Sequence, residues 1–393
     1  MESARSSGDP FSLLTSLLYD LERRCGLIKQ RLARLDDPDT QPYVLGAYQE
    51  VEKIRRESAA LRADPTLGQA PLRHNQFSQY RHRKQRLTIV EMYTVPFVER
   101  YSESDRHLTR LCRRLLMQVN WPIPAPLVTA FSSQYYWVPS EVEIIAAPAI
   151  ETMSLLGLPD LCHELGHLLW RHYQAVLVGE FINEILTYIR EQQRLIGAEQ
   201  RPPALRHDFE QLSVFWQDFW VKEFVADMVA TYLTGPTFGW QNVGLCAEMQ
   251  KSAFTPALGE TSIHPADAAR HTGILAVLSL LGDTDAARRV TARWTEYLDW
   301  SGEAEPGQYA VCYPGILIQS LAAKVVAGCQ RLGIRSYQAA PDWNEAPESV
   351  IDIVALVQEA WERLFHAPDS YNTWESDQIA ALQSLPQQGP KPV

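Results

Sequence analysis

The sequence Cys162-His163-Glu164-Leu165-Gly166-His167-Leu168 lies near the middle of the 393-residue chain, with apolar residues on both sides. It contains an HExxH pattern, in which two histidines four positions apart enclose a glutamate. On a helix the two imidazoles are about 40° and about 6 Å apart, so both can reach one metal ion while Glu164 faces a water molecule beside it. The pattern therefore predicts a catalytic zinc site. The alternative is a buried helix with two hydrogen-bonded core histidines.

The helix that carries this pattern has recognisable ends. Pro159 suits a first helical turn, Asp160 lies where the helix dipole favours an acid, and Gly179 follows the last apolar positions. We predict a helix from about 159 to 177 that is buried nearly all round.

A third zinc ligand must come from elsewhere in the chain. The glycine and third histidine that complete some HExxH sites are absent, because Trp170 and Tyr173 stand at those positions. The alternative is an acidic residue on a second helix. Glu184 is a minor candidate of this kind.

The stronger candidate is Glu223, on a helix predicted from about 203 to 233. An apolar stripe with 3.6-residue periodicity leads onto Glu223 and Asp227, and its members are Leu212, Phe215, Trp216, Phe219 and Trp220. A buried carboxylate is costly unless it is paired or binds a metal. We therefore predict Glu223 as the third ligand and Asp227 as the acceptor of a hydrogen bond from a zinc-bound imidazole. A structural ion pair with an arginine is the alternative.

Farther along the chain, Thr261-Ser262-Ile263-His264-Pro265 is followed by Arg270. Together with HExxH and the Glu-Phe-Val-Ala-Asp segment at 223–227, this pattern resembles the gluzincin zinc metallopeptidases over about residues 140 to 275. The most similar branch contains the prenyl-protein-processing and heat-shock membrane proteases. That branch is typically membrane-embedded, and the remainder of this chain matches nothing in it, so the resemblance does not extend to the substrate.

The resemblance implies one Zn²⁺ ion held by His163, His167 and Glu223. It also implies Glu164 as general base and His264 as a donor to the oxyanion. Arg270 would anchor the motif through an acidic partner. An alternative role for His264 is to cap a helix that starts at Pro265. Further candidate oxyanion donors are Tyr232, Tyr135 and Tyr136.

Periodicity elsewhere predicts helices with one exception. Residues 11–35 and 43–63 read as a helical hairpin, which is either an interaction module or packs on the main domain. Residues 134–148 are rich in aromatic and branched side chains and read as a strand or hairpin that would hold an extended peptide. We predict an α+β fold, predominantly α, with a zincin-like core, a small sheet or hairpin beside the HExxH helix, and flanking helical regions.

We expect the chain to consist of five regions. They are an N-terminal helical hairpin (1–70), a basic linker and helices that pack on the core (71–130), the zinc metallopeptidase core (131–300), a C-terminal helical region (301–385) and a disordered tail (386–393).

Composition limits the other functions. The net charge of −11 argues against the whole chain binding nucleic acid or anionic membranes. Residues 73–86 are nevertheless basic and contain two aromatic residues, which indicates either a phosphate-binding patch or, more simply, a solvated linker face. The six cysteines are scattered singly and are expected to be reduced, and the apolar runs at 274–281 and 315–328 are too short or too interrupted to span a membrane.

The function expected from the sequence is a cytoplasmic zinc metalloendopeptidase that cuts a protein or peptide substrate. Its N-terminal helices would be available to a regulatory partner. The alternatives are a zinc-containing regulatory or binding protein without proteolysis, and a nucleic-acid-associated protein that uses residues 73–86.

Overall fold

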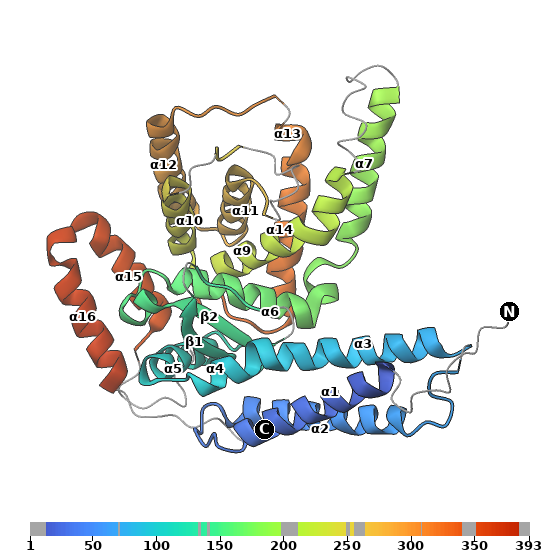
Figure 1. Cartoon of the computed structure of the whole chain (residues 1–393). Coiled ribbons are helices and arrows are strands. Elements are labelled where there is room, and N and C mark those ends of the chain that lie inside the picture. The colour runs from blue at the N-terminus through green and yellow to red at the C-terminus, as the bar shows by residue number, and fades with distance from the viewer. Residues whose placement is uncertain are drawn as a thin grey trace. The chain divides into compact units, whose positions relative to one another are not determined.

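The computed structural model describes residues 13–69, 71–132, 135–139, 142–197, 211–248, 252–254, 264–307, 309–339 and 351–384. These residues form many helices and one two-stranded sheet (Figure 1), so the predicted α+β class, predominantly α, is confirmed. The predicted tail at 386–393 and the predicted helix start near 203 lie outside the described residues. In chain order the elements are α1 (Leu13–Leu32), α2 (Gln41–Arg62), α3 (Arg73–Ile89), η1 (Val90–Thr94), α4 (Val95–Glu99), α5 (Glu103–Gln118), β1 (Leu127–Ser132), β2 (Ile144–Pro148), η2 (Ala149–Met153), α6 (Leu158–Val178), α7 (Phe181–Gly197), η3 (Phe215–Trp220), α9 (Val221–Thr234), α10 (Pro236–Glu248), α11 (Asp267–Leu280), α12 (Thr284–Ser301), α13 (Tyr309–Cys312), α14 (Gly315–Arg331), α15 (Ile353–His366) and α16 (Pro368–Ser384).

Contacts divide the chain into two compact units that differ from the five predicted regions. Unit 1 comprises residues 1–106, 127–131 and 139–144, and unit 2 comprises residues 107–126, 132–138 and 145–393. The predicted 301–385 region is part of the same unit as the HExxH helix, because α14 packs against α6, α9 and α11. The sequence could not show this packing, since α14 lies at least 35 positions from α11 and more than 80 positions from α6 and α9.

Unit 1 contains helices that pack side by side. Helices α1 and α2 are antiparallel neighbours, tied by ion pairs between Lys29 and Glu52 at 2.6 Å and between Arg62 and Glu22 at 2.8 Å. Helix α3 packs on both of them. Residues 73–86, expected from the sequence as a basic linker or solvated face, belong to helix α3. The segment has neither proline nor glycine and is rich in arginine and glutamine, which favour helix.

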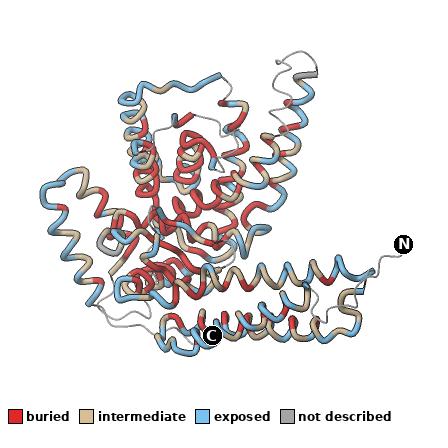
Figure 2. Tube along the Cα trace, viewed as in Figure 1, coloured by how far each residue is buried: buried red, intermediate tan, exposed pale blue. Residues whose placement is uncertain are grey.

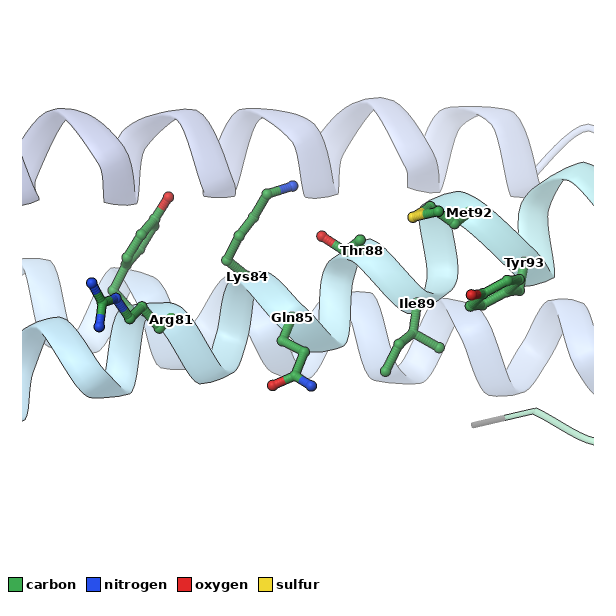
Figure 3. Close-up of a pocket in the computed structure, with 8 residues that line it drawn as sticks. Arg81, Lys84, Gln85, Thr88, Ile89, Met92 and Tyr93 are labelled. Atoms are coloured by element: carbon green, nitrogen blue, oxygen red, sulfur yellow. The ribbon is translucent and has the colours of Figure 1, made fainter. Parts of the chain in front are cut away.

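The positive charge of α3 is partly neutralised within unit 1. Arg86 contacts Glu50 at 2.6 Å and Glu57 at 2.9 Å, and Lys84 contacts Glu91 at 3.2 Å. An open hollow runs along the same helix and η1, lined by side chains that Figure 3 labels from Arg81 to Tyr93. These ion pairs leave less positive potential for nucleic-acid phosphates than the sequence of 73–86 suggests.

The sheet precedes the HExxH helix. Strands β1 and β2 pair, with the Leu127 N–H donating to the Glu143 carbonyl at 3.3 Å, and Trp137 forms an isolated antiparallel bridge with Ala146. The predicted strand segment at 134–148 thus contains β2 and the bridge. Strand β1 was not predicted.

Unit 2 is built around α6 and α9, which are buried along most of their length and lie beside α11 and α14 (Figures 1 and 2). Helix α6 begins at Leu158 and ends at Val178, one residue from each predicted end. It packs tightly against α9 at Gly166. A Cβ atom built there would lie 2.5 Å from the Cα of Ala226, closer than packed carbon atoms can come. The glycine inside HExxH therefore lets the two helices touch.

We expect Gly166→Ala to destabilise the protein by about 1–3 kcal/mol or more, because the added methyl group must push α9 away from α6. Gly244→Ala is the matched control. Gly244 lies in α10 with nothing within 4 Å of an added Cβ, so that substitution should stabilise the protein by about 0.5–1 kcal/mol. Urea unfolding of both variants measures the difference. Equal free energies of unfolding for the two variants would show that α6 and α9 can move apart without loss of stability.

One helical stretch, Tyr309–Arg331, is long and apolar enough to cross a membrane by length and composition. It includes the apolar run at 315–328, which from the sequence is not expected to span a membrane. Its most apolar window is 50% buried within the protein, and the core helix of a folded domain meets the same criteria.

Candidate metal centre

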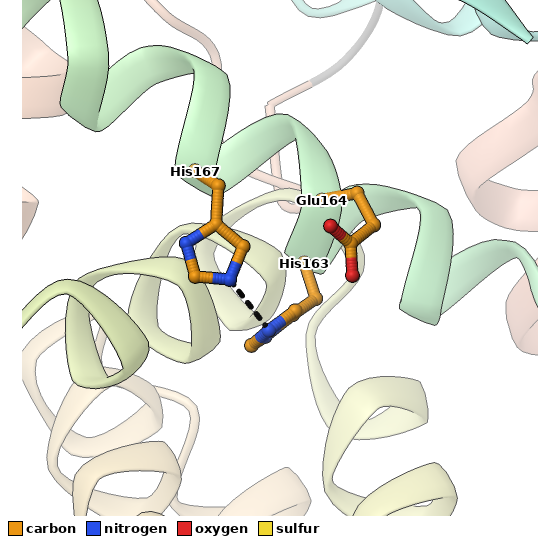
Figure 4. A group of neighbouring side chains, drawn as sticks. All are labelled: His163, Glu164 and His167. Carbon is orange, nitrogen blue, oxygen red and sulfur yellow. Dashed lines mark hydrogen bonds between the residues drawn. The ribbon is translucent and has the colours of Figure 1, made fainter. Parts of the chain in front are cut away.

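Helix α6 brings three potential ligands together. His163, Glu164 and His167 each offer a donor atom, and these atoms lie within 4.8 Å of one another, so the group can hold a metal ion (Figure 4). The two imidazole Nε2 atoms are 3.1 Å apart. His163 and Glu164 are buried, whereas the His167 side chain is 19% exposed. The centre is thus closed on the side of His163 and reaches solvent near His167.

Helix α9 adds two carboxylates to this group. The Glu223 Oε2 atom lies 3.7 Å from the Nε2 atoms of both His163 and His167. Asp227, one turn farther on, lies 2.8 Å from the Nδ1 atom of His163. Both carboxylates are buried, as the periodicity of the sequence predicts. The centre therefore offers two acids as a third donor, Glu164 from α6 and Glu223 from α9.

Arg270 on α11 fixes the Asp227 carboxylate. Its Nε and Nη2 atoms donate to the two oxygens of Asp227, each at 2.7 Å. Burial alone would raise the pKa of Asp227, but the charge and hydrogen bonds of Arg270 and the hydrogen bond from His163 lower it. Because an ionised carboxylate only accepts, Nδ1 of His163 carries a proton and its Nε2 is directed toward His167 and Glu223. This arrangement is typical of the outer shell of a metal-bound histidine.

His264 precedes α11 and contacts the other carboxylate. Its Nδ1 atom lies 2.9 Å from Oε2 of Glu223, and its side chain is 49% exposed. Although burial opposes ionisation of Glu223, the hydrogen bond from His264 and the nearby imidazole of His163 hold its pKa well below the usual value. One edge of the His264 imidazole thus orients Glu223, while much of the ring faces solvent.

The two histidines of α6 differ in their affinity for a proton. Burial disfavours charge on both, yet the hydrogen bond to Asp227 and the nearby Glu223 carboxylate raise the pKa of His163 to about 10. Burial lowers the pKa of His167 to about 3. Burial likewise raises the pKa of Glu164 to about 7. The centre concentrates charge in a buried place, which is characteristic of functional sites.

The three candidate tyrosines occupy different places. The Tyr232 hydroxyl donates to the Ile334 carbonyl at 3.0 Å, and nine residues of helix put Tyr232 about 13 Å from Glu223 on the opposite face. Tyr232 is therefore wrong as an oxyanion donor. Tyr136 is buried and hydrogen-bonds Glu151, whereas Tyr135 is 38% exposed and hydrogen-bonds Asp160.

Glu184 does not belong to the centre. Its carboxylate accepts hydrogen bonds from Ser320 at 2.5 Å and from Lys324 at 2.9 Å, both on α14. The minor alternative for the third ligand is therefore wrong.

Asp160, which the sequence places near the positive end of the helix dipole, also belongs to the surroundings of the centre. In the structure its side chain is buried, accepts a hydrogen bond from Gln241 at 2.6 Å and has a pKa raised by burial to about 6. Its spacing in the sequence could have indicated this, because Asp160 lies four residues before Glu164 and so on the same face of the helix.

His271, the neighbour of Arg270, gives the fold a pH dependence. It is buried, stacks on Trp294 with ring centroids 4.4 Å apart, and neither ring nitrogen has a hydrogen-bond partner among the described residues. Burial lowers its pKa to about 3. Below pH 6.5 the unfolded chain therefore binds a proton that the folded protein excludes, and stability falls as pH falls.

We expect His271→Phe, which keeps a ring against Trp294, to remove up to about 1.4 kcal/mol per pH unit of this acid sensitivity between pH 6.5 and 4. Urea unfolding at pH 7, 6 and 5 tests this. Identical pH slopes in the two proteins would mean that His271 is protonated in the folded state.

Comparisons of the chain with protein-family models, with curated proteins and with solved structures found no match. The centre itself is thus the basis for a function.

Proposed function

We propose that this protein is a zinc-dependent metalloendopeptidase of gluzincin type. The observation that carries the proposal is the convergence of three donor atoms from two helices, Nε2 of His163, Nε2 of His167 and Oε2 of Glu223, at 3.1, 3.7 and 3.7 Å from one another. A glutamate follows the first ligand, where a general base is needed.

The donor set fits zinc. Tetrahedral Zn²⁺ with nitrogen and oxygen ligands at about 2.0–2.1 Å needs donor atoms about 3.3–3.4 Å apart. The separation of 3.1 Å between the two imidazoles is slightly shorter than that value, and the two separations of 3.7 Å to Glu223 are slightly longer. The hydrogen bonds of Asp227 to His163 and of His264 to Glu223 hold two of the three ligands in orientation, as outer-shell partners do. Three protein ligands leave a coordination position for chemistry, whereas structural zinc sites usually have four.

When bound, Zn²⁺ would lower the pKa of a water molecule toward about 7 and polarise the scissile carbonyl. Glu164 takes the proton of the attacking water and delivers it to the leaving amine. Burial raises the pKa of Glu164, which makes its carboxylate a stronger base than an exposed glutamate. Because Nδ1 of His264 donates to Glu223, its Nε2 can donate to the developing oxyanion when the ring is an imidazolium.

The segment 135–139 supplies a place for an extended substrate. Trp137 exchanges both backbone hydrogen bonds with Ala146 of β2, at 3.0 and 2.9 Å. Because backbone groups alternate along a strand, those of Tyr136 and Val138 are directed to the other edge. The Tyr135 side chain reaches Asp160, one turn before Glu164. A peptide that adds to this outer edge would therefore run beside α6.

Metal content and cleavage test the proposal together. We expect purified protein to contain one equivalent of zinc, and a proteome-wide cleavage profile to show cuts that disappear after chelation and return with added zinc. A protein without stoichiometric zinc, or cuts that persist after chelation, would overturn the assignment. Chelation also releases the stabilisation that a bound ion provides, so the melting temperature should fall.

A further inference from the structure

Tyr313 contacts both elements that meet at the His264–Glu223 hydrogen bond. Its hydroxyl accepts a hydrogen bond from the Ala266 N–H at 3.0 Å, two residues after His264. Its ring packs on Trp220 with centroids 4.7 Å apart, one helical turn before Glu223. From these contacts we infer that Tyr313 is a positioning residue that sets the distance between His264 and Glu223, an inference that rests on the proposed zinc site.

The surroundings of Tyr313 hold it firmly. Tyr313 is 3% exposed and also packs on Tyr309 at 5.2 Å. Trp216 donates from its indole nitrogen to the carbonyl of Cys312, the residue before Tyr313, at 3.0 Å. A side chain held in this way transmits its position to whatever it contacts, because packed interiors yield little.

Tyr313 holds the backbone at the start of α11, next to His264. Ala266 is the residue before α11 and has an extended backbone, with φ −59° and ψ 141°, and it offers no side-chain cap. Its N–H is buried against the tyrosine hydroxyl. Without that acceptor the buried N–H must find water or move, because an unsatisfied buried donor is unfavourable. Movement at Ala266 carries His264 away from Glu223, which then loses the donor that orients it toward the two histidines.

Tyr313→Phe tests the inference, since it removes only the hydroxyl. We expect the zinc dissociation constant, measured by competition with a chromophoric chelator, to rise about tenfold, the lower end of the effect of an outer-shell change. Tyr232→Phe is the matched control. It also removes one hydrogen bond from a buried hydroxyl to backbone, but about 13 Å along α9 from Glu223, and should change zinc affinity by less than about twofold.

A double-mutant cycle separates positioning from general destabilisation. In a His264→Ala background, Tyr313→Phe should change zinc affinity by less than about twofold, because the contact that it positions is already gone. An equal loss of affinity in both backgrounds, or no loss in the wild-type background, would overturn the inference. Trp220→Phe tests the ring contact and should show the same dependence on His264 even if Tyr313→Phe folds poorly.

These measurements use zinc binding and not cleavage. If the protein binds zinc with the expected pattern but cuts no peptide, the proposed activity fails and the role of Tyr313 stands. If the cycle is additive while cleavage is intact, only the role of Tyr313 fails.

Discussion

Glu164→Gln should keep a full equivalent of zinc and reduce peptide cleavage by about 10²–10⁴-fold, the usual contribution of a general base. The amide has the shape of the carboxylate but cannot take a proton at neutral pH. Glu164 is buried and shows no hydrogen bond among the described residues, so the substitution should disturb little else. Zinc analysis, the melting temperature and the rate on a substrate from the cleavage profile are the three measurements.

Each outcome of that experiment has a distinct meaning. Loss of cleavage with zinc retained supports Glu164 as the base. Cleavage close to the wild-type rate would contradict the mechanism, whatever the metal content. Loss of zinc together with cleavage would make Glu164 a ligand and return the assignment to the other donor set, in which His163, Glu164 and His167 hold the ion.

The centre was predictable because its signals are local. The spacing of His163 and His167 depends only on helix geometry. A carboxylate such as Glu223 stands out in the sequence because it occupies a position where the helical periodicity predicts an apolar residue. The structure brings Glu223 and Asp227 to the two histidines, and the Arg270 guanidinium to Asp227. The same reasoning could have excluded Tyr232, because nine helical residues after Glu223 place it on the opposite face of the predicted helix.

Other features depend on long-range packing and left no pattern in the sequence. The role of Gly166 requires knowing that Ala226 lies opposite. Tyr313 is 49 positions from His264, and nothing in the intervening sequence points to their connection. The acidic partners of the basic segment at 73–86 are likewise distant in the sequence, because Glu50 and Glu57 lie on α2. Charge counted along one segment says little about the charge of the folded surface.

Glu223→Ala decides which carboxylate binds the metal. We expect zinc affinity to fall more than about 100-fold, beyond the range of outer-shell changes, and cleavage to be lost with it. The substitution removes the only donor that α9 places 3.7 Å from both imidazoles, among the residues that the structure describes. The substitution leaves the contact between His163 and Asp227 in place. The protein should therefore still fold while the centre loses its third ligand.

Glu184→Ala is the control for Glu223→Ala, because both remove a glutamate from a helix of unit 2 and Glu184 was the competing candidate in the sequence. Glu184 contacts Lys324 and Ser320, so its loss should leave zinc affinity within about twofold of wild type and lower stability by no more than about 1 kcal/mol, as for a partly exposed ion pair. Retention of zinc by Glu223→Ala would refute the ligand assignment. Combined with loss of zinc in Glu164→Gln, it would place all the ligands on α6 and remove the base from the mechanism, so the two variants together distinguish a catalytic centre from a site that only binds metal.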